Sequence, residues 1–306
     1  MKLILILVVF AFSLTVGAQE PGKAKLDEMQ GLLSEKLRSA TNNEPFVNSL
    51  EMEFVPVPIT GGPTDGEKVL FCRWETRVKD YAAYASVNPG VDMQWKDFEW
   101  KGQGQEDDHP VINVSWEDAQ GFCAWLTEVE RKSGRIGAED VYRLPSDHEW
   151  SCAVGIGDRE QAADSPQDKH EQIGAVYPWG TGWPPPHGAG NYSESVAKRA
   201  FDWKRGITGY SDGYALTAPV GSYLANAYGL YDLGGNCSEW CEDWYDPSEQ
   251  NYRAWRGGNW GTGRGGGPLS SFRSGHRPSQ RHFFYGFRCV LSAAPHPQGR
   301  SDQSSP

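Results

Sequence analysis

The chain has 306 residues, and 29 Lys and Arg against 40 Asp and Glu give it a formal net charge of −11. This acidic balance argues against a nucleic-acid binder, which needs clustered positive charge to release counterions from phosphates. The chain is rich in Trp (13), Gly (36) and Pro (20), which predicts a loop-rich fold packed on aromatic rings rather than one built from long regular elements.

The N-terminus has the pattern of a secretory signal peptide, residues 1–18. An apolar run, Leu3–Phe12, follows Lys2, and the small side chains of Val16 and Ala18 suit a signal peptidase. The run is too short to span a bilayer comfortably, although an uncleaved membrane anchor is the alternative interpretation. No later segment is apolar enough to span a membrane, so we expect a secreted or periplasmic protein with no membrane span in its mature chain.

The remaining chain divides into three parts. Residues 19–48 are charged, with apolar side chains recurring along one face, and are interpreted as an amphipathic spacer. Residues 293–306 are rich in Pro, Gln and Ser and are predicted to be a disordered tail. A single domain is therefore expected over residues 49–292.

Within this domain the patterns predict short elements. Strands are expected at 54–57 and 69–71, and an apolar face at helical spacing predicts a helix from Val78. Ser115 and Ser146 are each followed three residues later by an acid, the signature of a helix-starting capping box. Little periodicity is visible in residues 155–219. The domain is thus predicted to be α+β with long ordered loops.

The cysteines are even in number, which in an oxidising compartment favours disulfides. Six cysteines allow 15 connectivities, and the sequence does not choose among them. Zinc at Cys237 and Cys241 is the alternative, but no second half-site lies nearby to complete four ligands. The six residues are Cys72, Cys123, Cys152, Cys237, Cys241 and Cys289.

Long loops in a compact domain need something to organise them, and calcium is one candidate. Asn191, Asp212, Asp232 and Glu239 are hard oxygen donors that lie in Gly- and Asn-rich segments, the combination that Ca²⁺ requires. The alternative is that these residues serve only turn chemistry.

Ordered motifs along the body resemble the formylglycine-generating enzyme (sulfatase-modifying factor) family. The resemblance implies the family's variant of the C-type lectin fold, with low regular secondary structure and bound calcium. It is carried by His109–Trp116, Tyr142–Trp150, Tyr177–Gly180, Tyr228–Asp232, Gly235–Trp240, Arg256–Trp260 and Gly286–Cys289.

The resemblance implies two structural calcium sites, neither of them catalytic. Asp232 stands where the family has Asn, a change that keeps an oxygen donor and adds charge. The first site would use the side chains of Asn191 and Asp212 with the carbonyls of Tyr192 and Tyr214. The second would use the side chains of Asp232 and Glu239 with the carbonyls of Gly235 and Cys237.

The resemblance also implies a disulfide between Cys123 and Cys289. Three connectivities then remain for the other four cysteines. Cys152 matches a family half-cystine whose partner position is Ser274 here.

Family enzymes oxidise a substrate cysteine with copper(I) held by two active-site cysteines. Here the first copper position falls on Thr262, and no cysteine occurs between Cys241 and Cys289. Copper(I) demands thiolate ligands, so copper-dependent formylglycine generation is not expected. Iron is not excluded, because His276 and His282 lie near the vacated positions, but no third ligand can be identified.

Two functions remain. The first is a binding module that holds a peptide, glycan or protein partner in the former substrate groove; the second is an oxidoreductase of the same superfamily with different metal ligands. Arg273 and Arg277 have the alternative interpretation of structural hydrogen-bond donors beneath the groove. The groove is predicted to be lined by Trp260, Thr262, Arg273, His276 and Arg277.

Overall fold

The computed structural model describes residues 37, 39–100, 103–193, 206–263 and 267–292. The predicted signal peptide and tail, and most of the predicted spacer, lie outside these residues. Within the described part, no helix has the length and apolar character needed to cross a membrane.

A five-stranded sheet joins the two ends of the domain. Its order is β1-β2-β3-β11-β6, and every neighbouring pair is antiparallel. Val290 in β11 pairs with Phe71 on one side and with Arg143 on the other, so β11, from the end of the domain, lies inside the sheet between β3 and β6. The strands are β1 (Phe46–Val47), β2 (Glu53–Pro58), β3 (Lys68–Cys72), β6 (Val141–Arg143) and β11 (Val290–Ser292).

This sheet confirms the two predicted strands, since 54–57 and 69–71 lie in β2 and β3. It also includes β1, which the predicted boundary assigns to the spacer. The ordered domain therefore begins before residue 49.

A second sheet has the order β10-β7-β8-β9, in which β10 pairs with β7 in parallel and the other pairs are antiparallel. The strands are β7 (Ser238–Trp244), β8 (Arg253–Arg256), β9 (Arg273–His276) and β10 (Tyr285–Gly286). A separate hairpin pairs β4 (Glu99–Trp100) with β5 (Gln103–Gly104).

The predicted capping boxes start two helices. Ser115 Oγ accepts the Asp118 N–H at the start of α3 (Trp116–Lys132), and Ser146 Oγ accepts the Glu149 N–H at the start of α4 (Asp147–Val154). The remaining helices are α2 (Val78–Val87), the 3₁₀ turns η1 (Met93–Lys96) and η2 (Gly157–Arg159), and α5 (Pro166–Lys169).

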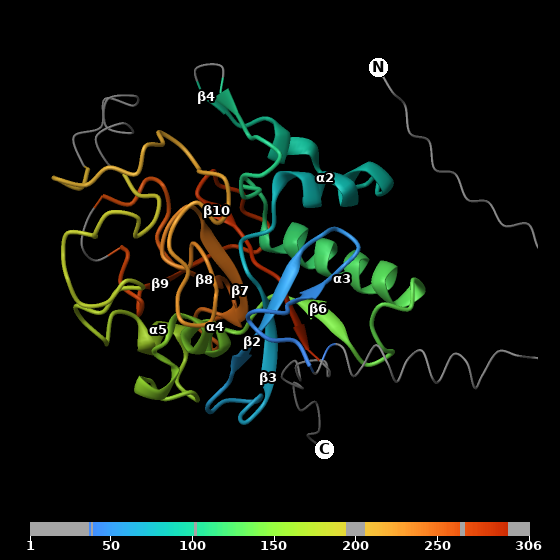
Figure 1. The fold of residues 1–306 in the computed structure, drawn as a ribbon, viewed down its shortest axis with the longest axis horizontal. Coiled ribbons are helices and arrows are strands. Elements are labelled where there is room, and N and C mark those ends of the chain that lie inside the picture. The colour runs from blue at the N-terminus through green and yellow to red at the C-terminus, as the bar shows by residue number, and fades with distance from the viewer. Residues whose placement is uncertain (1–36, 38, 101–102, 194–205, 264–266, 293–306) are drawn as a thin grey trace, which may run out of the picture.

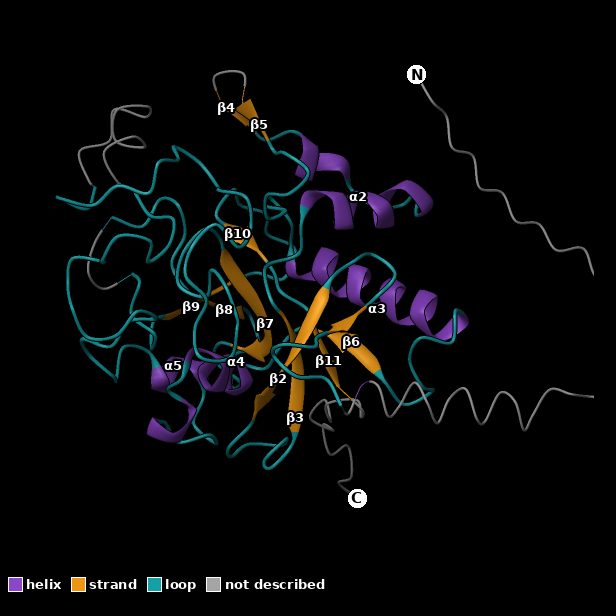
Figure 2. Ribbon diagram, viewed as in Figure 1, coloured by secondary structure: helices purple, strands orange, loops and turns teal. Residues whose placement is uncertain are grey.

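The helices pack against both sheets. In Figure 1, α3 runs beside the five-stranded sheet, which it contacts through β6, while α4 contacts β2, β7 and β8. α4 therefore lies between the sheets, and its Trp150 is fully buried there. Between α5 and β7 the described chain forms loops with a single isolated bridge, Tyr177 to Gly180 (Figure 2). The loop-rich α+β prediction is confirmed.

Candidate functional site

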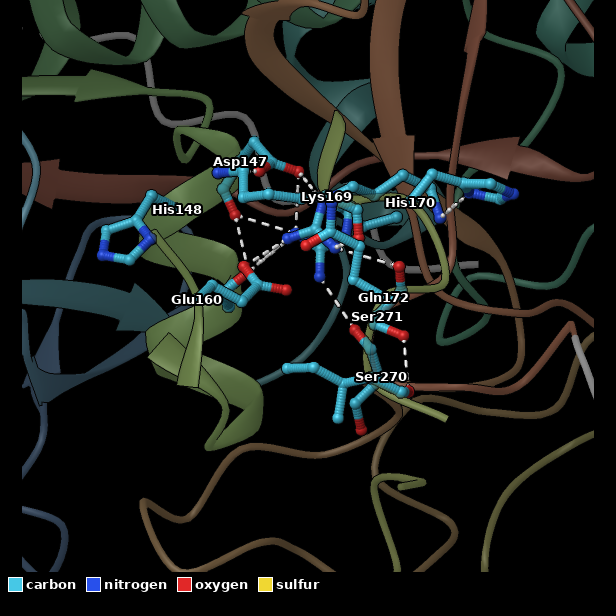
Figure 3. A network of polar contacts seen from close by, with 12 residues as sticks. Asp147, His148, Glu160, Lys169, His170, Gln172, Ser270 and Ser271 are labelled. Atoms are coloured by element: carbon cyan, nitrogen blue, oxygen red, sulfur yellow. Dashed lines mark hydrogen bonds and ion pairs between the residues drawn. The ribbon is translucent and has the colours of Figure 1, made fainter. Parts of the chain in front are cut away.

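A buried network of charges joins α4 and α5 to strands β8 and β9 of the second sheet (Figure 3). Asp147 is the first residue of α4. Its Oδ1 lies 2.8 Å from both Arg256 Nη1 and Arg273 Nε, and its Oδ2 lies 2.7 Å from Lys169 Nζ. All four side chains are at most 3% exposed. Burial alone would raise the pKa of Asp147, but the three cations together hold it well below its usual range.

Arg273 is therefore an interior residue and does not line a groove as predicted. Its guanidinium also donates to Ser151 Oγ at 2.8 Å and to Glu160 at 2.5 Å. Its exposed fraction is 0%, so no hydrogen-bond donor remains for a ligand outside. The alternative interpretation of Arg273, a structural donor, matches this geometry.

The other predicted groove residues lie at different depths. Trp260 is 1% exposed, and its Nε1 donates to the carbonyl of Phe283 at 3.1 Å. Thr262 is half-buried, and its Oγ1 accepts the Asn259 N–H at 2.9 Å. Arg277 is exposed, and within the described residues no carboxylate pairs with it.

Two histidines flank the ring of Tyr285. The centroid of His276 lies 5.8 Å from that ring and the centroid of His282 lies 5.2 Å from it. His276 Nδ1 accepts the N–H of Arg277 at 3.0 Å, and His282 Nδ1 accepts the N–H of Phe284 at 3.2 Å. Each neutral ring thus carries its proton on Nε2, which makes Nε2 a donor rather than a metal ligand. The two rings do not fit an iron site.

The first predicted calcium site contains one buried oxygen donor that accepts no hydrogen bond. The Oδ1 atom of Asn191 is buried without a hydrogen-bond partner, because the amide nitrogen is turned toward the carbonyl of Leu216 at 2.6 Å. Asp212, by contrast, accepts the N–H groups of Tyr192 at 2.7 Å and Tyr214 at 3.0 Å. The structure brings these four residues together, with the amides of Tyr192 and Tyr214 facing the carboxylate.

The second predicted site contains an acid that the sequence reasoning missed. Glu75, in the connection between β3 and α2, is 0% exposed, and its Oε2 has no hydrogen-bond partner. Burial and then Asp232 raise its pKa well above its usual range. Asp232 Oδ1 is likewise buried without a partner, and burial raises the pKa of Asp232 to about 6. Only tertiary packing unites Glu75 with Asp232, because they are far apart in the chain.

Arg288 is the nearby cation. Its Nη2 lies 2.8 Å from Glu239 Oε1, and Trp150 Nε1 donates to Glu239 Oε2 at 3.0 Å. The carboxylate of Glu239 is thus already engaged on both oxygens. Three buried acids, Glu75, Asp232 and Glu239, share this one arginine.

These acids form no metal site by side chains alone. Across the ranges that the structure describes, no group of three or more His, Cys, Asp and Glu side chains is placed to hold a metal. A cation at either predicted site would therefore depend on backbone carbonyls as well. Hard carboxylate, amide and carbonyl oxygens are the donor set that suits calcium.

All six cysteines are buried free thiols in this structure. The sulfur atoms of Cys123 and Cys289 lie 3.5 Å apart, so the predicted partners are neighbours. Cys237 directly precedes β7 and Cys241 lies within it. The three strand steps from Ser238 to Cys241 alone span roughly 10 Å, which argues against a bridge between Cys237 and Cys241. Cys152 lies 3.8 Å from His148 Nε2.

A pocket of about 400 Å³ lies between the end of α2 and the start of α3, and none of the predicted groove residues lines it. Arg281 borders it and pairs with Asp118 at 2.9 Å and Asp92 at 3.5 Å.

Residues 52–293 match the sulfatase-modifying factor enzyme 1-like domain. The chain belongs to this family. Structures with the same fold include PvdO from Pseudomonas aeruginosa, with a TM-score of 0.54 and 20% identity over 81% of this chain and 98% of that one. CarF has a TM-score of 0.51 and 22% identity over 79% of this chain and 98% of that one.

Relatives within the sulfatase-modifying factor family have diverse names. The formylglycine-generating enzyme of Thermomonospora curvata is 35% identical over 49% of this chain and 39% of its own length. The inactive C-alpha-formylglycine-generating enzyme 2 of Mus musculus is 31% identical over 60% of this chain and 49% of its own length. The serine/threonine-protein kinase pkn1 of Chlamydia caviae is 29% identical over 60% of this chain and 24% of its own length. The chain therefore spans less than half the length of these relatives.

Proposed function

We propose that this chain is a secreted or periplasmic, non-catalytic member of the family that binds a peptide, glycan or protein partner. The supporting observation is the residue at the first copper position. Thr262 offers a hydroxyl that already accepts the N–H of Asn259, where copper(I) requires a thiolate. A relative named as inactive supports the proposal, because a fold does not by itself confer activity.

The ligand surface that we propose is the exposed end of β9 and the segment after it. Arg277 and the Nε2 atoms of His276 and His282 are hydrogen-bond donors, and the ring of Phe283 is 37% exposed beside them. Donors with an apolar neighbour favour a ligand that carries carbonyl or carboxylate oxygens, as a peptide does.

Structural calcium is part of this proposal. Asn191 would hold one ion with Asp212. Asp232 would hold the other with Glu75 rather than with the predicted Glu239, whose two oxygens are engaged by Arg288 and Trp150. Carbonyls would complete each site. Calcium would supply positive charge to the buried carboxylates and order the loops. Within the chain, the unpartnered oxygens of Asn191, Asp232 and Glu75 support this assignment.

The absence of catalysis is tested with copper(I) and a sulfatase-type cysteine peptide under oxygen. We expect no formylglycine by mass spectrometry, and no stoichiometric copper or iron in the purified protein by metal analysis. Any turnover, or a bound equivalent of either metal, would overturn the proposal in favour of an oxidoreductase.

Binding is tested on a peptide array with the wild-type chain, Arg277→Ala and the control Arg159→Ala, which changes an exposed arginine in η2. We expect peptides with acidic residues to bind the wild type and the control and to lose at least fivefold in affinity with Arg277→Ala. Equal binding by all three proteins would place the ligand surface elsewhere.

A further inference from the structure

Three imidazole rings accept main-chain N–H groups in β9 and in the segment that connects β9 to β10. His170 follows α5, and its Nδ1 accepts the N–H of Arg273 in the edge strand β9 at 3.1 Å (Figure 3). His276 Nδ1 and His282 Nδ1 accept the N–H groups of Arg277 and Phe284 in the same way.

A main-chain N–H can only donate, so each of these Nδ1 atoms must carry a lone pair. A protonated imidazole has N–H groups at both nitrogens and accepts nothing. Protonation of each ring therefore abolishes one of these bonds and leaves a main-chain N–H facing another N–H. Histidine is the side chain whose ordinary pKa, about 6.5, places this change in a physiological range.

Few charges face the three rings. Glu171 Oε2 lies 3.9 Å from His170 Nε2, and the ring of Phe272 packs beside it. Arg277 and His282 face His276, whose other neighbours are the rings of Tyr252 and Tyr285. The titratable neighbour of His282 is His276, and the ring of His282 also contacts Phe283, Phe284 and Tyr285.

His276 and His282 have lowered pKa values. Burial, and then Arg277, lower the pKa of His276, while burial, and then His276, lower the pKa of His282. A lowered pKa means that these groups stabilise the fold fully above their ordinary pKa of about 6.5. That contribution is lost as the pH falls from there through the folded-state value.

The same segment holds other parts of the molecule together. The carbonyl of His282 accepts the N–H of Asn113, and the carbonyl of Pro278 accepts the N–H of Glu117 at the start of α3. The carbonyl of Phe283 accepts Trp260 Nε1. The N–H of Glu171, beside His170, donates to the carbonyl of Ser271 just before β9.

We propose that acidification releases residues 170–172 and 276–284 from the residues they pack against by protonating His170, His276 and His282. As the pH falls below the ordinary histidine pKa of about 6.5, these main-chain hydrogen bonds break, and the segment after β9 separates from its neighbours. This inference goes beyond the proposed binding function and does not depend on any ligand.

The test is amide hydrogen exchange, expressed as protection factors corrected for the intrinsic pH dependence of exchange. In the wild type we expect protection of the amides of Arg273, Arg277 and Phe284 to fall at least tenfold from pH 7.5 to pH 5.0. In the triple variant His170→Asn, His276→Asn and His282→Asn, the Asn Oδ1 replaces Nδ1 as an acceptor that does not titrate. Protection in this variant should change less than twofold.

The control is His187→Asn, which changes an exposed histidine and should keep the wild-type response. If the triple variant does not fold, the double variant His276→Asn/His282→Asn is followed at Arg277 and Phe284 alone. Unchanged protection in the wild type, or an equal loss in the Asn variant, would overturn the proposal. Because no ligand enters the experiment, its failure leaves the binding proposal standing, and the peptide array can fail independently.

Discussion

At the scale of single residues, Asp147 is the acid that pairs with three buried cations in the interior. Its carboxylate faces Arg256, Arg273 and Lys169, and Glu160 is the second acid, paired with Arg273. Removing one partner of a buried ion pair leaves uncompensated charge and costs about 3–5 kcal/mol. We expect Asp147→Asn to lower the free energy of unfolding in urea by that amount.

The control for this change is Asp158→Asn, an exposed acid in η2. It should alter the free energy of unfolding by less than about 0.5 kcal/mol. If Asp147→Asn were as stable as the control, other groups would neutralise the three cations, and the role assigned to Asp147 would be wrong.

The pH dependence of the same residue has a defined sign. Because the three cations lower the folded-state pKa of Asp147, its contribution is fully present above the unfolded-state value of about 3.9. We expect the stability difference between wild type and Asp147→Asn to be constant from pH 7 to pH 5 and to shrink as the pH falls below about 4. Urea unfolding at each pH measures it, and a difference that shrank already at pH 6 would contradict the assignment.

At the scale of elements, α3 depends on its first residue. Ser115 and Asp118 exchange side-chain and main-chain hydrogen bonds, and Arg281 pairs with the same Asp118. Loss of such a cap costs about 1 kcal/mol, so Ser115→Ala should lower the free energy of unfolding by that amount. Ser279→Ala changes an exposed serine and should be neutral in the same urea titration.

A second element-scale prediction concerns the link between α3 and β11. The sulfur atoms of Cys123 and Cys289 are adjacent, and a bond between them would close a loop of 166 residues. For the oxidised protein we expect a Cys123–Cys289 peptide pair under non-reducing mass spectrometry. Reduction should then lower stability by about 2–5 kcal/mol. Detection of both thiols as free after oxidative folding would contradict the pairing.

At the scale of the whole molecule, calcium should stabilise the loop-rich half of the domain. Ligands that bind only the folded state raise its stability, so added calcium should raise the melting temperature by several degrees at a hundredfold excess over Kd. Asp232→Ala should reduce that increase, whereas Asp97→Asn, an exposed control, should keep it. A melting temperature indifferent to calcium and to chelator would argue against both sites.

Short-range patterns predicted more of this fold than of its site. The capping residues Ser115 and Ser146 and the strands β2 and β3 follow from local spacing, because a cap or an alternation involves neighbours in the chain. The depth of Arg273 and the role of Glu75 do not. Both depend on packing against residues distant in the sequence. A single acid after a strand, such as Glu75, shows no periodic pattern that would predict its burial.

By itself the sequence determined the family, the loop-rich α+β class and the absence of thiolates at the copper positions, because motifs and residue types are local properties of the chain. Tertiary structure alone decided which predicted groove residues face outward. Arg273 turned inward because Asp147 and Glu160 lie beneath it, whereas Arg277, four residues further on, has no such partner in the described structure. The burial of a charged side chain depends on how the folded layers pack. It is favourable only where folding places opposite charges beside that side chain, which local sequence patterns do not reveal.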